Sequence, residues 1–173
     1  MIKKRQQAGF SLIEVLVAIL VLMVGILGVA GMQMVSFQTN QAAYARSQAI
    51  YLAQDIFDRI RANPTGYATS TVYDNVLSTS SGTIPNDPAC VTTAGGCTPA
   101  QMAQQDVREW ADNFVDVFSS TDYRPTLPGG VGQLTRTALT NTFTATITWN
   151  ERDWNNGSRT IESRQVAITV TLN

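Results

Sequence analysis

The feature that most constrains this chain is an apolar run near its N-terminus. Val15–Met32 is eighteen residues long and holds no charged side chain, and the next charge after Glu14 is Arg46. An α-helix rises 1.5 Å per residue, so this run spans roughly 27 Å, close to the thickness of a bilayer's hydrocarbon core. The run therefore predicts a membrane-spanning helix over residues 15–32.

Basic residues precede the run and indicate its orientation. Lys3, Lys4 and Arg5 lie before it, and basic residues beside a membrane span tend to stay in the cytoplasm. Residues beyond the span are therefore expected in the periplasm or outside the cell. Ala43-Tyr44-Ala45 fits the cleavage site of an ordinary secretory signal, but it lies more than ten residues past the run. Such a signal has a shorter apolar core with its cleavage site close behind, so this spacing disfavours cleavage there.

Two missing residue types exclude most catalytic sites. The chain has no histidine and no lysine after Lys4, which removes Ser-His and Cys-His pairs, Schiff-base lysines and histidine-ligated metals. Without the three basic residues before the run, nine arginines face thirteen acids. Nucleic-acid binding instead needs clustered Lys and Arg. We therefore expect no enzyme, no cofactor, no metal and no nucleic-acid partner.

The two cysteines lie in a stretch rich in Thr, Gly and Pro. Cys90 and Cys97 are seven positions apart. In an exported domain the simplest interpretation is one disulfide that closes a short loop. Two free thiols are the alternative.

The helical pattern continues past the apolar run. No helix breaker occurs between Met32 and Asn63, and Pro64 and Gly66 follow. Small or apolar residues recur in this part at helical spacing: Ala45, Ala49, Leu52, Ile56 and Ile60. We expect one helix over residues 10–62, whose second half packs against a globular head formed by residues 63–173. Asp55 and Arg59 predict an i,i+4 ion pair on its surface.

The head is expected to mix helix and sheet. Residues 64–98 predict an irregular connecting loop, and Thr98-Pro99 is a favourable start for a second helix over 99–118. The acids of that helix are expected to form a solvated face: Asp106, Glu109, Asp112 and Asp116.

After residue 130 the apolar pattern changes to a period of two. It predicts a strand near 131–138, then a hairpin that turns at residues 155–158, with Trp149 facing inward and Trp154 near the turn as a candidate partner contact. The fold class is α+β, with a small antiparallel sheet packed on the long helix and a threonine-rich face left open.

The sequence Gly9-Phe10-Ser11-Leu12-Ile13-Glu14 stands directly before the apolar run. With the basic residues ahead of it, this segment resembles the class III signal of type IV pilins and their relatives. The resemblance implies a leader over residues 1–9 that prepilin peptidase removes after Gly9, and methylation of the new N-terminal residue Phe10. It also implies that Glu14 guides assembly by pairing with the N-terminal amine of a neighbouring subunit, an amine that is cationic at neutral pH.

A second stretch narrows the resemblance. Leu52–Pro64, together with Glu14–Ala18, resembles the PilV family of type IV pilus modification proteins, which are minor pilins. The family implies a minor pilin that primes pilus assembly in the inner membrane with its head in the periplasm. It would then reach the cell surface at the filament tip, with other minor pilins, the major pilin and a tip adhesin as partners. Major pilins usually enclose a disulfide loop near the C-terminus, whereas Cys90 and Cys97 precede the expected sheet, which argues against a major pilin.

Two alternatives stay open at the level of sequence. A type II secretion pseudopilin would carry the same leader. A membrane-anchored periplasmic binding module would keep its N-terminus uncut and would tolerate loss of the Glu14 carboxylate.

Overall fold

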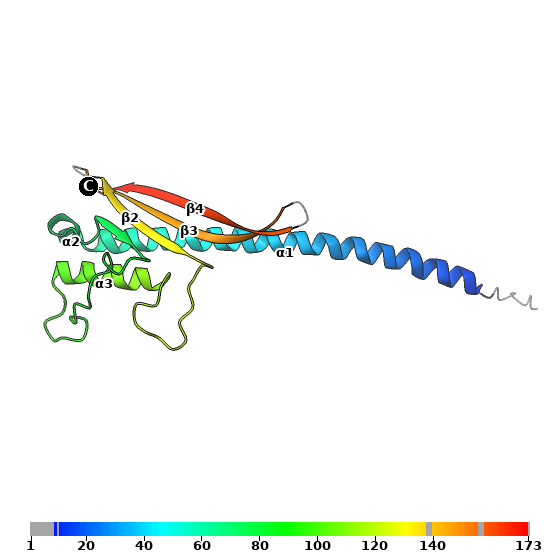
Figure 1. Cartoon of the computed structure of the whole chain (residues 1–173), viewed down its shortest axis with the longest axis horizontal. Helices are drawn as coiled ribbons and strands as arrows, with labels where there is room; N and C mark the ends of the chain where they lie inside the picture. The colour runs from blue at the N-terminus through cyan, green and yellow to red at the C-terminus, as the bar shows by residue number, and fades with distance from the viewer. Residues whose placement is uncertain (1–8, 10, 138–139, 156–157, 173) are drawn as a thin grey trace, which may run out of the picture. The chain divides into compact units, whose positions relative to one another are not determined.

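The computed structural model describes residues 9, 11–137, 140–155 and 158–172. It leaves the side chains of residues 154–159 undescribed. The chain divides into two compact units, residues 1–42 and 43–173. The elements, drawn in Figure 1, are α1 (Leu12–Ala62), α2 (Pro64–Thr69), β1 (Asn75–Leu77), α3 (Pro99–Asp112), β2 (Val131–Thr137), β3 (Thr142–Asn155) and β4 (Ser158–Thr171). The predicted α+β class is confirmed.

Helix α1 crosses the boundary between the two units. Its residues in the first unit are exposed along the whole length from Leu12 to Gln41. Among the described residues, α1 is the helix that is long and apolar enough to cross a membrane, judged by length and composition. In the second unit one face of α1 is buried, formed by Ala49, Leu52, Ala53, Ile56, Phe57 and Ile60. The apolar stripe predicted from the sequence is therefore the core-facing side.

The end of α1 lies where the sequence places it, but the residues that end it also start a new helix. Asn63 accepts a hydrogen bond from the N–H of Gly66 through Oδ1, at 3.0 Å, and Pro64 occupies the first helical position. A side-chain acceptor followed by proline is a favourable helix start. The prediction of an irregular loop over 64–98 is thus wrong at α2, and also at β1.

In the second unit α1 lies between two layers. The sheet covers one side of the helix and α3 the other (Figure 1). The core brings all three together: Trp110 of α3, Phe57 of α1 and Phe143 of β3 are each at most 1% exposed. The indole N–H of Trp110 donates to the carbonyl of Leu52 at 2.8 Å, which fixes α3 against α1.

The sheet is antiparallel with the order β1-β2-β3-β4. Strand β2 lies where a strand near 131–138 was predicted, and β3 and β4 form the predicted hairpin. Alternate side chains of β3 are buried in the core: Phe143, Ala145, Ile147 and Trp149. The threonines between them face the other side, and Thr142 and Thr144 bond Thr171 and Thr169 of β4 through their hydroxyls.

Helix α3 is shorter than predicted and buries one of its acids. It begins with a capping box between Thr98 and Gln101 but ends at Asp112, not at residue 118. The side chain of Asn113 donates to the carbonyls of Glu109 and Trp110 and satisfies the helix end, while Asp112 accepts from the N–H of Val117 and turns the chain. Asp106 is only 7% exposed, so the prediction that it lies on a solvated face is wrong.

Candidate functional site

The N-terminal residues singled out by the sequence lie at the start of α1. Gly9 is exposed, whereas Phe10 and residues 1–8 lie outside the described residues. The N–H groups of Glu14 and Val15 both donate to the carbonyl of Ser11, at 3.0 and 3.3 Å, so Glu14 belongs to the first helical turn. A carboxylate is favourable there because the first turn of a helix presents unpaired N–H groups and the positive end of the helix dipole.

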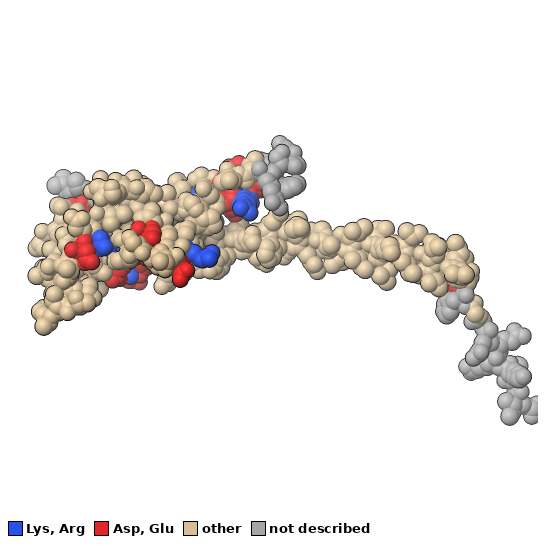
Figure 2. All heavy atoms as spheres, turned by 60° about the horizontal axis from the view of Figure 1, so that its bottom comes forward, with Lys and Arg blue, Asp and Glu red and all other residues tan. Residues whose placement is uncertain are grey.

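Glu14 is set apart from the rest of the first unit by its charge. No Lys, Arg, Asp or Glu follows it until Arg46, and on the face shown in Figure 2 this stretch of α1 is free of charged side chains. Exposed apolar surface of this extent needs lipid or other helices to cover it. The first unit therefore offers a long apolar helix that carries one carboxylate at its N-terminal end.

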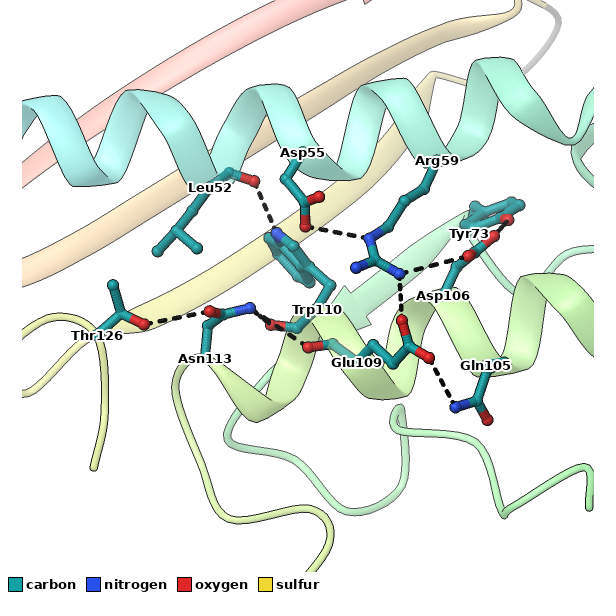
Figure 3. A network of polar contacts seen from close by, with 10 residues as sticks. All are labelled: Leu52, Asp55, Arg59, Tyr73, Gln105, Asp106, Glu109, Trp110, Asn113 and Thr126. Carbon is teal, nitrogen blue, oxygen red and sulfur yellow. Dashed lines mark hydrogen bonds and ion pairs between the residues drawn. The ribbon is translucent and has the colours of Figure 1, made fainter. Parts of the chain in front are cut away.

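A polar network in the head ties α3 to α1 (Figure 3). The predicted pair is present, with Nε of Arg59 and Oδ2 of Asp55 3.1 Å apart. The guanidinium also reaches α3, where its Nη1 lies 2.6 Å from Glu109 and 3.6 Å from Asp106. The side chain of Arg59 is only 27% exposed. The pair of Asp55 and Arg59 is therefore part of a network that connects α1 with α3, and not an isolated salt bridge on the surface.

A tyrosine from the segment after α2 closes the network. The hydroxyl of Tyr73 donates to Oδ2 of Asp106 at 2.5 Å. The side chain of Asn63 donates to the Tyr73 hydroxyl at 3.4 Å and to the carbonyl of Pro99 at 2.7 Å. These contacts join the end of α1, the start of α3 and the loop between them.

The network shifts the ionisation of its members. Burial raises the pKa of Asp106, although the hydrogen bond from Tyr73 and the charge of Arg59 act in the opposite direction. Burial would also raise the pKa of Glu109, but hydrogen bonds from Arg59 and Gln105 outweigh it and hold that pKa below its usual value. Burial and the Asp106 carboxylate together raise the pKa of Tyr73.

The chemistry of this network is structural. Its carboxylates are held by an arginine, a tyrosine and a glutamine, and no described group of three or more His, Cys, Asp or Glu could hold a metal ion. The sequence predicted only the contact between Asp55 and Arg59. The other contacts of the network join segments that lie far apart in the sequence. The network orients the head on the second half of α1.

Cys90 and Cys97 form a disulfide in the structure, with Cα atoms 4.9 Å apart. Cys90 is buried, and Cys97 directly precedes Thr98, the N-cap of α3. The bridge therefore fixes the loop at the point where α3 begins.

Comparison with known proteins bears on both units. Residues 4–30, which include Gly9, Phe10 and Glu14, match the model of the prokaryotic N-terminal methylation motif. Residues 31–108 match the family model of the type IV pilin Tt1218. No curated protein and no solved structure matches the chain.

The two matches meet at residue 30 and together cover the long helix and the first part of the head. The narrower resemblance to the PilV family stays a prediction, as do cleavage after Gly9, methylation of Phe10 and the role of Glu14. With the long apolar helix and the small antiparallel sheet, the matches identify this chain as a protein of pilin-like α+β fold that carries an N-terminal methylation motif.

Proposed function

We propose that this chain is a minor pilin that primes type IV pilus assembly in the inner membrane and is then carried at the filament tip. The observation that carries the proposal is the N-terminal arrangement. An exposed glycine stands just before an apolar helix that holds one carboxylate in its first turn. The methylation-motif match over residues 4–30 includes the glycine, the carboxylate and the first part of the helix.

The mechanism follows from the physics of a charge in an apolar setting. A carboxylate near the bilayer centre costs roughly 2.5–3.5 kcal/mol on insertion scales. After cleavage behind Gly9, a neighbouring subunit would present a cationic amine, and an ion pair with Glu14 offsets the cost of burying either charge alone. Because the pair forms only when two helices are correctly offset along their length, Glu14 would set the axial position of each incoming subunit.

The head supports a minor and not a major subunit. Its disulfide lies before α3 and before the three long strands, whereas major pilins usually enclose a loop near the C-terminus. A head whose disulfide loop differs in position from that of major pilins would suit contacts with specific neighbours. These include other minor pilins, the major pilin and a tip adhesin.

The first test is intact-mass and N-terminal peptide analysis of the chain recovered from membranes and from sheared pili of its native host. We expect a chain that starts at methylated Phe10, present in both fractions. A chain that retains Lys3 and Lys4, or one that starts within residues 41–46, would contradict the proposal and leave an anchored or periplasmic module.

Variants test the carboxylate separately from the cleavage. Glu14→Ala is expected to be cleaved normally and to be missing from sheared pili, while Ser11→Ala, in the same turn, is expected to be incorporated. Normal piliation by the Glu14→Ala variant would remove the assembly role.

Deletion of the gene distinguishes a role in the type IV pilus from a role in a type II secretion pseudopilus. Fewer pili with normal protein secretion would support priming of a type IV pilus. Loss of secretion with normal pili would instead assign the chain to a type II secretion pseudopilus. Immunogold label along the whole shaft, and not at filament ends, would overturn the tip location.

A further inference from the structure

The two edges of the sheet differ in how their backbone groups are satisfied. Strand β1, at one edge, is three residues long. The hydroxyl of Thr83 accepts from the N–H of Leu77 at 2.9 Å and donates to the carbonyl of the same residue at 2.8 Å. A side chain thus satisfies the outward backbone groups of Leu77 at this short edge.

Strand β4, at the other edge, is fourteen residues long and has β3 as its hydrogen-bonded neighbour. The N–H of Leu172 donates to the carbonyl of Asn141 at 2.8 Å, in the same register as the pair Phe143–Val170. Opposite residues in an antiparallel ladder alternate between bonded and non-bonded pairs. The even-numbered residues of this part of β4 therefore bond β3, and the odd-numbered ones direct their N–H and C=O groups outward.

The threonine contacts agree with this assignment. Side chains approach most closely at non-bonded pairs, and the hydroxyls of Thr171 and Thr169 lie 3.0 and 2.9 Å from those of Thr142 and Thr144. The residues that direct backbone groups to the free edge are Gln165, Ala167, Thr169 and Thr171. In the part of the chain that the structure describes, no side chain bonds these backbone groups.

This edge lacks the features that usually prevent strands from pairing there. Natural edge strands are kept short, or carry proline, lysine or a bulge. Residues 165–171 contain no proline, glycine or charged residue, and their register with β3 is unbroken. Val166, Ile168 and Val170 are half-buried and pack against the core, so apolar surface remains beside the free backbone.

We propose that the outer edge of β4 over residues 165–171 receives an extended segment of a different subunit, which joins the sheet as a fifth strand. Only an extended backbone matches a row of alternating donors and acceptors. Its side chains would be apolar where they lie beside Val166, Ile168 and Val170, and small and polar beside the threonines. It would be uncharged, because β4 offers no counter-charge over this part.

The proposal rests on the proposed function where it specifies a different subunit. Antiparallel pairing of β4 with β4 of a second copy requires a two-fold axis, which reverses the direction of the strand. Subunits of one filament keep the same direction along it. Pairing of β4 with β4 of a second copy would therefore not fit inside a filament.

The test removes one outward N–H from the full-length chain in its native host. Ala167→Pro deletes that donor without touching the ladder to β3, and proline is tolerated at sheet edges. Ala167→Ser is the matched control, since it keeps the N–H. We expect Ala167→Pro to fold, to be cleaved after Gly9, and to fall about tenfold in the pilus fraction, the order expected for losing a hydrogen bond and introducing a ring at the contact.

A photo-crosslinking residue identifies the occupant and does not depend on the proline variant. Placed at Gln165 it is expected to capture an uncharged segment of another pilin-type subunit. Placed at Gln133, which is exposed on the interior strand β2, it is expected to capture none. An adduct with a second copy of the chain, equal capture from both positions, or normal incorporation of Ala167→Pro would overturn the proposal. A wild-type chain that is neither cleaved nor found in pili would instead refute the proposed function.

Discussion

Tyr73 donates its phenolic hydrogen to Oδ2 of Asp106 over 2.5 Å, and both side chains are buried. The same carboxylate lies 3.6 Å from the guanidinium of Arg59, which Asp55 and Glu109 also contact. One cation thus serves three acids between α1 and α3. The balance of charge in this network makes the stability of the head sensitive to pH and to single substitutions.

The Asp106→Asn variant should gain stability relative to wild type as the pH rises. Burial raises the pKa of Asp106, so the folded chain holds a proton that the unfolded chain has already released. Wild-type stability from this group is therefore full below the ordinary Asp pKa of about 4 and is lost as the pH rises through the folded pKa. The side-chain amide of the variant does not titrate, and its oxygen can still accept the Tyr73 hydrogen bond.

Thermal unfolding of the full-length chain in detergent between about pH 3.5 and pH 8 measures this difference. The exposed residue Asp122 provides a control, because Asp122→Asn makes the same chemical change at the surface of the head. A constant difference between Asp106→Asn and wild type across the range would contradict the prediction.

Arg59→Gln should destabilise the head by about 2 kcal/mol. The change leaves Asp55, Asp106 and Glu109 together without their cation, and removing one partner of a buried ion pair costs more than the pair contributes. The estimate lies below the value for full burial because Arg59 is 27% exposed. Chemical denaturation followed by near-UV circular dichroism measures the loss.

The matched control is Arg61→Gln, two residues further along α1. Arg61 pairs with Asp58 at 2.7 Å, but their side chains are 48% and 72% exposed. Exposed pairs contribute little, so this variant should unfold close to wild type. Equal losses from both arginine variants would show that α3 does not depend on the network.

The sequence predicted the elements whose pattern repeats over many residues. The structure confirms three such predictions: the apolar stripe from Ala45 to Ile60, the end of α1 and the alternation in β3. Each depends on residues close together in the sequence. Strand β1 was not predicted, because three residues are too few to show an alternating pattern of polar and apolar side chains. Its pairing is set by Leu134 and its neighbours in β2, far along the chain.

Asp106 shows why the network could not be read from the sequence. It lies three residues after Ala103 and four before Trp110, both fully buried, and this spacing places it beside the apolar face of α3. A prediction based on the pattern of polar and apolar residues places such an acid on the solvent-exposed face of the helix. The partners that make its burial favourable, Tyr73 and Arg59, come from other segments, and no spacing within α3 indicates them.

Gly132→Ala should destabilise the head by about 1–3 kcal/mol, the usual cost of overfilling a packed core. A Cβ at this position would lie 2.5 Å from a ring carbon of Phe114 and 2.7 Å from one of Trp110. The two rings already pack edge to face with centroids 5.1 Å apart, and Trp110 bonds Leu52. The indole therefore cannot move without loosening α3 from α1.

Gly95→Ala is the matched control, because a Cβ there meets no atom within 4 Å. The two variants are compared by thermal unfolding together with the near-UV signal of the buried tryptophans. Unchanged stability in Gly132→Ala would mean that the core between α3 and β2 is looser than the contact distances indicate.

Joint replacement of Cys90 and Cys97 by serine should cost about 2.5 kcal/mol, the loop-closure entropy of a bridge that encloses roughly eight residues. The effect should concentrate at the start of α3, since Cys97 adjoins the capping residue Thr98. Hydrogen exchange is the measurement that locates it, and amides of the first turn of α3 should lose protection before those near Trp110. Wild type treated with a reductant should reach the same stability as the double variant, because both lack the same constraint on the unfolded chain. If the double variant unfolded with wild-type stability and wild-type exchange, the bridge would be dispensable for α3, and the capping box of Thr98 and Gln101 would suffice to hold the helix start.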